Sequence, residues 1–392
     1  MPTCRGSIRA SGAHPMKIGI SGSYGMHNLG DEAILEAMVA MIRERDPGAE
    51  VRIFSRNAAH TNCYHGFEAV DVRVLSDQQA LRASADLDVL ILGGGGILYD
   101  AEIDLYLREA DLATSFGIPV VVFAVGAGPM NDPAERSEVD KILSRAAVVT
   151  TRDEESMELL RSCGVAADIM EVAADPALLL EPCGRTQAEA ILVSQGIPVG
   201  EKLVGVSVRQ PDVTCPWLDE IKYHELLAAV VDRMIDEWKV RAVFIPMEPE
   251  HDIPHAEIVV GKMRKPQKAT ILKNGLRPSE VMGVTGLFQL AVGMRLHFMM
   301  LSAAMGTPIA PLLYAPKVSA FIRQLGLGFP ERDISSITPQ DYFSFIQDIW
   351  RRKDDIKARF ASAILDLRQR AVKSGVLLFE RVFGEEIIRE QS

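Results

Sequence analysis

Short apolar runs alternate with helical patterns along most of the chain. In the first half these runs occupy residues 17–21, 51–54, 89–92, 120–125 and 148–150. The order strand, helix, strand predicts a parallel sheet. Several runs are wholly apolar, which is typical of strands that helices cover on both faces. We therefore expect a doubly wound, Rossmann-like α/β domain over residues 16–185.

The apolar pattern stops at residues 180–185 and then starts again. The second series of runs covers residues 203–208, 242–245, 270–272, 287–292 and 309–313. A chain of 392 residues exceeds the size at which a single core keeps growing, so two domains are expected. We predict a second Rossmann-like parallel-sheet domain over residues 190–330, a boundary near residues 182–200, and a ligand-binding cleft between the domains.

The two ends of the chain are predicted to differ from these domains. Thr338 suits a helix N-cap, Pro339 suits the first turn, and Asp341 suits the positive end of a helix. A stripe of apolar residues at helical spacing follows, so residues 335–392 are expected to be helical, with one long helix packing back across the domains. Residues 1–15 carry no apolar stretch and are expected to be a disordered leader.

Composition and charge exclude several classes of function. A net charge of −11 with no long Lys/Arg tract argues against a nonspecific nucleic-acid binder. The longest apolar runs fall far short of the ~20 residues that span a bilayer. The five cysteines show neither disulfide nor metal spacing, which favours a cytoplasmic protein. They are Cys4, Cys63, Cys163, Cys183 and Cys215.

Two groups of potential metal ligands lack a recognised spacing. One lies in residues 60–65 and the other in residues 248–255. Pro249 and Pro254 bracket the second group and favour a loop over a helix that would place both of its histidines on one face. We therefore predict no metal site.

The most informative segment is residues 293–297, where an apolar strand is predicted to give way to an apolar helix. Arg295 and His297 set a cation beside an imidazole at the strand end, where α/β sheets bind ligands. The helix start carries no Asp or Glu, so its dipole is free to attract an anion. The alternative is a core histidine, but Arg295 would then be expected to lack a partner.

Arg209 follows the strand predicted at residues 203–208. Two guanidinium groups at neighbouring strand ends, Arg209 and Arg295, match a ligand that bears both a carboxylate and a phosphate. A solvent-exposed ion pair is the alternative for Arg209 alone.

A glycine-rich turn at residues 21–32 follows the first strand and lacks the dinucleotide and phosphate-loop spacings. Asp31 and Glu32 occupy the helix start where a phosphate would bind, so the turn suits hydroxyl groups better. Asp31 as a helix cap is one interpretation. The functional interpretation makes Tyr24, Asn28 and Asp31 groups that bind an acceptor.

Four consecutive glycines, residues 93–96, end another strand, where backbone N–H groups can face a ligand. Tight packing is the alternative, but four glycines exceed what one turn needs, so ligand approach is favoured. Asp100 lies just beyond.

Arg152 and Asp153 are predicted to form a structural pair, and Asp175 is predicted to form a turn.

Together these segments resemble the polysaccharide pyruvyl transferase family over about residues 17–326. The resemblance rests on N-x-G-D-E-A at 28–33, the glycine turns at 93–96 and 126–129, R-D-x-x-S at 152–156, Asp175–Pro176, and R-L-H at 295–297. It implies two facing Rossmann-like domains, similar to the GT-B glycosyltransferases. Ala315 stands where the family usually has Asp, and the glutamine often found before the glycines near Ala127 is missing.

The resemblance implies transfer of a pyruvyl group from phosphoenolpyruvate to a sugar of a cell-surface polysaccharide or its lipid-linked precursor. The product would be a pyruvate ketal, with release of phosphate and no cofactor. The donor would bind Arg209, Arg295 and Leu296, and His297 would be the catalytic acid. The acceptor would bind the glycine-rich turn at residues 21–32 and the glycines at 93–96 with the residues just beyond them. The residues concerned are Tyr24, Asn28, Asp31, Gly94, Gly95 and Asp100.

Two other functions fit the same pattern. One is a GT-B glycosyltransferase that uses a nucleotide sugar, and the other is a non-catalytic sensor of an anionic metabolite. The pairing of Arg295 with His297 favours catalysis. A lipid-linked acceptor implies peripheral association with the inner face of the membrane, to which the basic residues 262–273 would contribute, although a solvated surface is their default interpretation. A homo-oligomer is also expected.

Overall fold

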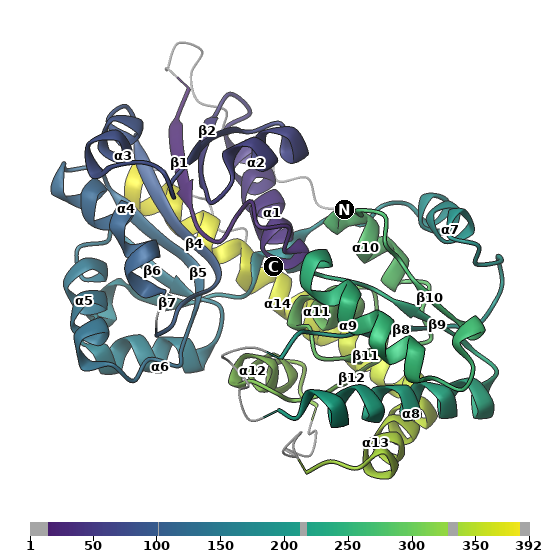
Figure 1. The fold of residues 1–392 in the computed structure, drawn as a ribbon. Helices are drawn as coiled ribbons and strands as arrows, with labels where there is room; N and C mark the ends of the chain where they lie inside the picture. The colour runs from purple at the N-terminus through teal and green to yellow at the C-terminus, as the bar shows by residue number, and fades with distance from the viewer. Residues whose placement is uncertain (1–14, 101, 212–217, 328–335, 385–392) are drawn as a thin grey trace. The chain divides into compact units, whose positions relative to one another are not determined.

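The computed structural model describes residues 15–100, 102–211, 218–327 and 336–384 (Figure 1). The chain folds as two compact units. The first comprises residues 1–26, 31–179 and 367–392, and the second comprises residues 27–30 and 180–366, as far as these ranges are described. The predicted leader lies outside the described residues, apart from Pro15. No helix of the described ranges combines the length and the apolarity needed to cross a membrane.

The first unit is built on a seven-stranded sheet whose order is β3-β2-β1-β4-β5-β6-β7. Every neighbouring pair is parallel. The strands are β1 (Lys17–Ser21), β2 (Glu50–Ser55), β3 (Glu68–Asp71), β4 (Val89–Leu98), β5 (Val120–Ala127), β6 (Val148–Thr151) and β7 (Met170–Val172). The helices between them are α1 (Leu29–Arg45), α2 (Ala58–His65), α3 (Asp77–Ser84), α4 (Ile103–Ser115), α5 (Pro133–Leu143) and α6 (Glu154–Cys163).

The central strands of this sheet are covered on both faces. Almost every residue of β4 and β5 is buried, which explains why their sequence is apolar without alternation. The edge strands β3 and β7 are absent from the apolar runs that predicted the other strands. No residue of β3 is fully buried, and β7 has only three residues, so neither produces an apolar run.

The second unit has a five-stranded parallel sheet in the order β10-β9-β8-β11-β12. Its strands are β8 (Leu203–Ser207), β9 (Arg241–Phe244), β10 (Ala269–Ile271), β11 (Leu290–Gly293) and β12 (Ile309–Pro311). Its helices include α7 (Arg185–Ser194), α8 (Glu220–Trp238), α9 (Pro249–Lys262), α10 (Pro278–Thr285), α11 (Leu296–Ala304) and α12 (Pro316–Gln324). The predicted class, two Rossmann-like parallel-sheet units, is confirmed.

The loop predicted around Pro249 and Pro254 is wrong, because both prolines lie in α9. Pro249 occupies the first turn, where a backbone N–H is not needed. The carboxylate of Asp252 also accepts hydrogen bonds from the backbone N–H groups of Met247 and Glu248, at 2.9 and 3.0 Å, and so fixes the start of the helix. Pro254 therefore removes one hydrogen bond from a helix that is already anchored.

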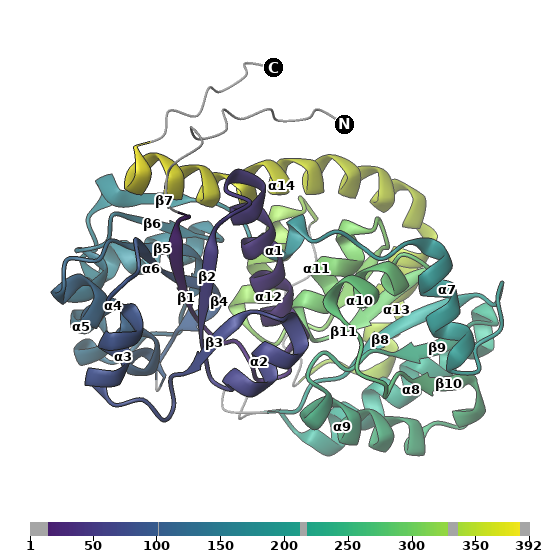
Figure 2. The same ribbon diagram turned by 90° about the horizontal axis from the view of Figure 1, so that it is seen from above.

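The predicted N-cap at Thr338 is confirmed. Its hydroxyl accepts from the N–H of Asp341 at 3.1 Å, and the two residues form a capping box. A single long helix was expected, but the structure has two, α13 (Pro339–Arg351) and α14 (Lys353–Phe383), separated at Arg352. Helix α14 itself runs without interruption (Figure 2).

Different units hold the two ends of this helical region. In the second unit the ring of Trp350 stacks on that of Trp238, with centroids 4.1 Å apart. In the first unit the Ser374 hydroxyl lies 2.8 Å from that of Thr150, and Arg370 donates to the carbonyl of Ala173 at 3.0 Å. The first unit therefore includes a segment from the far end of the chain.

Candidate active site

In the second unit, the two predicted donor arginines follow neighbouring strands. Strands β8 and β11 pair in parallel, with Ser207 opposite Gly293. A Cβ on Gly293 would lie 2.0 Å from the carbonyl oxygen of Ser207, so only glycine fits there. Arg209 and Arg295 each lie two residues beyond this pair. The structure therefore sets both guanidinium-bearing segments at the same edge of the sheet, as the sequence predicts.

Arg295 is held by two carboxylates. Its guanidinium donates to Asp252 at 2.5–3.1 Å and to Glu248 at 2.8 Å. The argument that a core histidine would leave Arg295 without a partner therefore fails. Both acids come from the region predicted as a loop, because Asp252 lies in α9 and Glu248 directly precedes that helix. A contact of Arg295 with the donor stays a prediction.

The buried pair between Arg295 and Asp252 shifts both titrations. The Asp252 side chain is 1% exposed, and burial raises the pKa of its carboxyl group although Arg295 opposes that rise. Burial alone would lower the pKa of Arg295, but the charge of Asp252 outweighs it and the pKa is raised. Arg295 therefore stays a cation throughout the physiological range.

Arg209 is also buried, at 8% exposure, so the solvent-exposed alternative is wrong. Its backbone N–H donates to the hydroxyl oxygen of Tyr223 at 3.2 Å. Its guanidinium lies over the ring of Tyr314, 4.8 Å from the centroid, as in a cation–π contact. The sequence analysis did not single out Tyr314 as an orienting residue, although it directly precedes Ala315.

His297 lies in the first turn of α11, and that turn contains no acidic residue. The side chain of Leu296, another predicted donor contact, is buried. A Cβ on Gly30 would lie 2.0 Å from Nδ1 of His297, so the imidazole packs directly against that glycine. The nearby N–H of Leu29 donates to the carbonyl of Met247 at 2.8 Å. Residues 27–30, which belong to the second unit, therefore lie beside the predicted acid.

Asn28 supplies a side-chain cap in this segment. Its Oδ1 accepts from the N–H of Gly30 at 3.0 Å. Asp31 lies within the first turn of α1, and its Oδ1 would be 3.1 Å from a Cβ on Gly95. Asp31 and Gly95, both predicted acceptor residues, are therefore neighbours in the first unit.

The four glycines at 93–96 lie inside β4 and do not end the strand as predicted, because β4 continues to Leu98. Packing explains two of them. A Cβ on Gly93 would lie 2.4 Å from the Phe123 carbonyl oxygen, and one on Gly94 would lie 2.1 Å from Ile34. Tyr24 is fully buried, and its hydroxyl donates to the Gly93 carbonyl. The structure thus gives Tyr24 a contact that supports the glycine segment of β4. Acceptor binding by Tyr24 and Gly94 stays a prediction.

Asp100 organises the loop that follows β5. Its carboxylate accepts from the backbone N–H of Asn131 at 2.8 Å and from that of Asp132 at 3.3 Å. Partial burial would raise the pKa of Asp100, but these hydrogen bonds outweigh it and the pKa is lowered. Asp100 is therefore a stable carboxylate near neutral pH.

Arg152 is a buried residue of the first unit with a second acidic neighbour, Asp175, that was not predicted. The predicted pair with Asp153 is present, with Nε 3.4 Å from Oδ2. Arg152 also lies 3.6 Å from Asp175, and a Cβ on Gly126 would be 2.5 Å from its guanidinium carbon. The signal was present in the R-D-x-x-S and Asp-Pro motifs, but nothing in the sequence joined them.

A buried histidine, His65, supports the glycine-rich turn at residues 21–32 through a hydrogen-bond network. Nε2 of His65 lies 2.7 Å from Glu32, and Nδ1 lies 3.3 Å from Glu36. The other oxygen of Glu32 accepts from the N–H of Gly25 at 3.0 Å. This network accounts for His65 without a metal and ties α2 to the glycine-rich turn.

We expect the His65→Gln variant to lose more stability at pH 6 than at pH 9. Burial lowers the pKa of His65, but the hydrogen bonds to Glu32 and Glu36 outweigh it and the pKa is raised. A raised pKa stabilises the fold fully below the unfolded value of about 6.5, and this contribution is lost as pH rises through the folded pKa. Denaturant unfolding of both proteins across this range measures it. The same loss at every pH would contradict a charged His65.

Solved structures of similar fold define the class of protein. The chain aligns over 94% of its length with 97% of Staphylococcus aureus MnaA, solved with UDP, at 11% identity and a TM-score of 0.67. It also aligns with Anabaena HepE in complex with UDP and glucose, over 94% of this chain and all of that one, at 12% identity and a TM-score of 0.62. These similarities show a GT-B-like fold.

Sequence comparison then gives the family. The family model for polysaccharide pyruvyl transferase matches residues 28–316, which is more than half of the chain. The amylovoran biosynthesis protein AmsJ of Erwinia amylovora is 21% identical over 287 residues, which are 71% of this chain and 69% of AmsJ. The chain belongs to the polysaccharide pyruvyl transferase family, a family of transferases in polysaccharide biosynthesis, as the sequence motifs predicted.

Proposed function

We propose that the protein transfers a pyruvyl group from phosphoenolpyruvate to a sugar of a cell-surface polysaccharide or its lipid-linked precursor. One observation carries the proposal. Arg209, which is buried, and Arg295, whose side chain is 11% exposed, follow adjacent strands of one sheet. His297 lies two residues beyond Arg295 in an acid-free helix start. This arrangement suits a small ligand with a carboxylate, a phosphate and a carbon that must be protonated.

The arginines bind the carboxylate and phosphate of the donor, and His297 supplies a proton. Protonation of the donor's methylene carbon uses the electron pair of its double bond and leaves an oxocarbenium-like centre at the neighbouring carbon. One sugar hydroxyl attacks that centre and gives up its proton, which returns His297 to its acid form. A second hydroxyl then displaces phosphate, and the proton it loses leaves with the phosphate. The product is a cyclic pyruvate ketal.

The predicted acceptor groups are polar side chains and glycine backbone. Asn28 shapes the segment that packs on His297, because it caps the turn that contains Gly30. Asp31 beside Gly95 provides a carboxylate able to orient sugar hydroxyls. Asp100 is a second carboxylate in the first unit. These groups would position the acceptor without contributing to the proton transfer.

The nucleotide-sugar alternative rests on the similar structures that were solved with UDP or UDP and glucose. Donor choice separates the two functions. We expect the purified protein to release inorganic phosphate from phosphoenolpyruvate when a lipid-linked or nucleotide-linked sugar acceptor is present, and to do so in EDTA. Release of a nucleoside diphosphate from an activated sugar, with phosphoenolpyruvate inert, would favour a glycosyltransferase. Binding of either compound without turnover would favour a sensor.

A further inference from the structure

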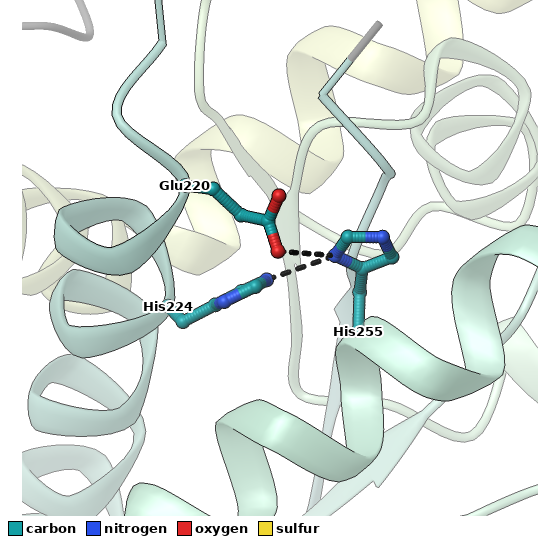
Figure 3. Close-up of side chains that lie close together, drawn as sticks. All are labelled: Glu220, His224 and His255. Atoms are coloured by element: carbon teal, nitrogen blue, oxygen red, sulfur yellow. Dashed lines mark hydrogen bonds and ion pairs between the residues drawn. The ribbon is translucent and has the colours of Figure 1, made fainter.

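Two histidines and a glutamate of the second unit converge at one point between two helices. Glu220 and His224 lie one turn apart at the start of α8, and His255 lies on the facing helix α9. Figure 3 shows the carboxylate of Glu220 and the ring of His224 both directed at Nδ1 of His255. The His224 ring is buried, His255 is partly buried and Glu220 is exposed. No step of the proposed reaction uses this cluster.

The spacing of the three ligand atoms fits a single metal ion. Nε2 of His224 lies 3.0 Å from Nδ1 of His255, and Oε1 of Glu220 lies 3.8 Å from the same nitrogen. All three atoms lie within 4.8 Å of one another. Around a tetrahedral ion with bonds of about 2.0–2.1 Å, neighbouring ligand atoms are about 3.3 Å apart. Only small side-chain adjustments would therefore bring the three atoms to bonding distance.

The chemistry of the pair also suits a metal. Two imidazole nitrogens that face each other must share a proton between them, and a metal ion can take the place of that proton. An imidazole binds a metal ion in its neutral form, so metal binding would release this shared proton.

The geometry points to a divalent-metal site formed by Glu220, His224 and His255. Two imidazoles and one carboxylate favour a borderline ion such as Zn²⁺ over Mg²⁺ or Ca²⁺, which prefer oxygen ligands. The ion would join α8 to α9, and α9 also carries Asp252, the partner of Arg295. Its role would be to hold these helices together, so this site is independent of the proposed transfer reaction.

Metal titration of the full chain tests the site. Protein stripped with EDTA is titrated with ZnCl₂ against a chromophoric chelator, and with CoCl₂ followed by visible absorption. We expect one tight equivalent per chain and a higher thermal midpoint with zinc than without it. His255→Ala should weaken that equivalent at least about 100-fold, and Glu220→Gln about tenfold, because each removes one ligand.

His251→Ala is the matched control. His251 lies one turn before His255 on the same helix, but it is half-exposed and outside the cluster. The His251→Ala variant should bind zinc with the same affinity as the unmodified protein. Equal zinc affinity in His255→Ala and the unmodified protein would overturn the proposal. The absence of a stoichiometric zinc site would also overturn it, and the two histidines would then form only a hydrogen-bonded pair. Phosphate release in EDTA tests the transferase function separately from both outcomes.

Discussion

His297→Ala is expected to lower kcat for phosphate release by about 10²–10⁴-fold, the range that a positioned general acid contributes. The expectation follows from the place of His297 in the first turn of α11, two residues beyond Arg295. Since the arginines remain, the affinity for phosphoenolpyruvate should change little. Single-turnover phosphate release and equilibrium binding of phosphoenolpyruvate measure the two effects separately.

A second variant distinguishes the chemical role of His297 from its packing. The imidazole lies against Gly30, so removal of the ring also opens a space there. His297→Gln fills much of that space but cannot serve as an acid. Both variants should therefore lose turnover, while only His297→Ala should lower the thermal midpoint appreciably. His251→Ala, a half-exposed histidine of the same unit, should keep full turnover. An unchanged kcat in His297→Gln would rule out the assigned acid.

Arg295→Met is expected to weaken both the fold and donor binding. Removal of one partner of a buried ion pair costs about 3–5 kcal/mol, because the remaining charge is left uncompensated. Here that charge is Asp252, which is 1% exposed. Loss of a charge-assisted hydrogen bond to the donor should also lower kcat/KM by about 10–100-fold. Denaturant unfolding and steady-state kinetics measure the two losses.

The double variant Arg295→Met, Asp252→Asn separates these two roles. Asparagine removes the uncompensated charge but keeps an oxygen that accepts from the backbone N–H groups of Met247 and Glu248. Stability should therefore recover in large part, while kcat/KM should stay low. If activity recovers together with stability, Arg295 only holds α9 in place and does not contact the donor.

The sequence predicted the fold well because burial leaves a direct signal. Strands covered on both faces, such as β4 and β5, must be apolar at every position, and short apolar runs therefore located them. The failures lie where that signal is weak. Strand β3 has no fully buried residue, and α9 contains a proline that ordinarily ends a helix.

The positions of the candidate site residues followed from topology, but their contacts did not. Residues at the ends of parallel strands gather at one edge of a sheet, which placed Arg209 with Arg295. The partner of Arg295 is Asp252, 43 residues away along the chain. Likewise, the ring of Tyr314 beneath Arg209 depends on tertiary packing. No periodicity or spacing in a single sequence encodes such pairs.

Helix α14 has a practical consequence for dissecting the protein into parts. Its residues from Leu367 onward belong to the first unit, where Ala371, Leu378 and Phe379 are buried. A gene fragment that stops at Leu179 would encode all seven strands of that sheet but none of these side chains. Separate production of the first unit would therefore require a chimera, with the segment from Leu367 joined through a linker to the fragment's end.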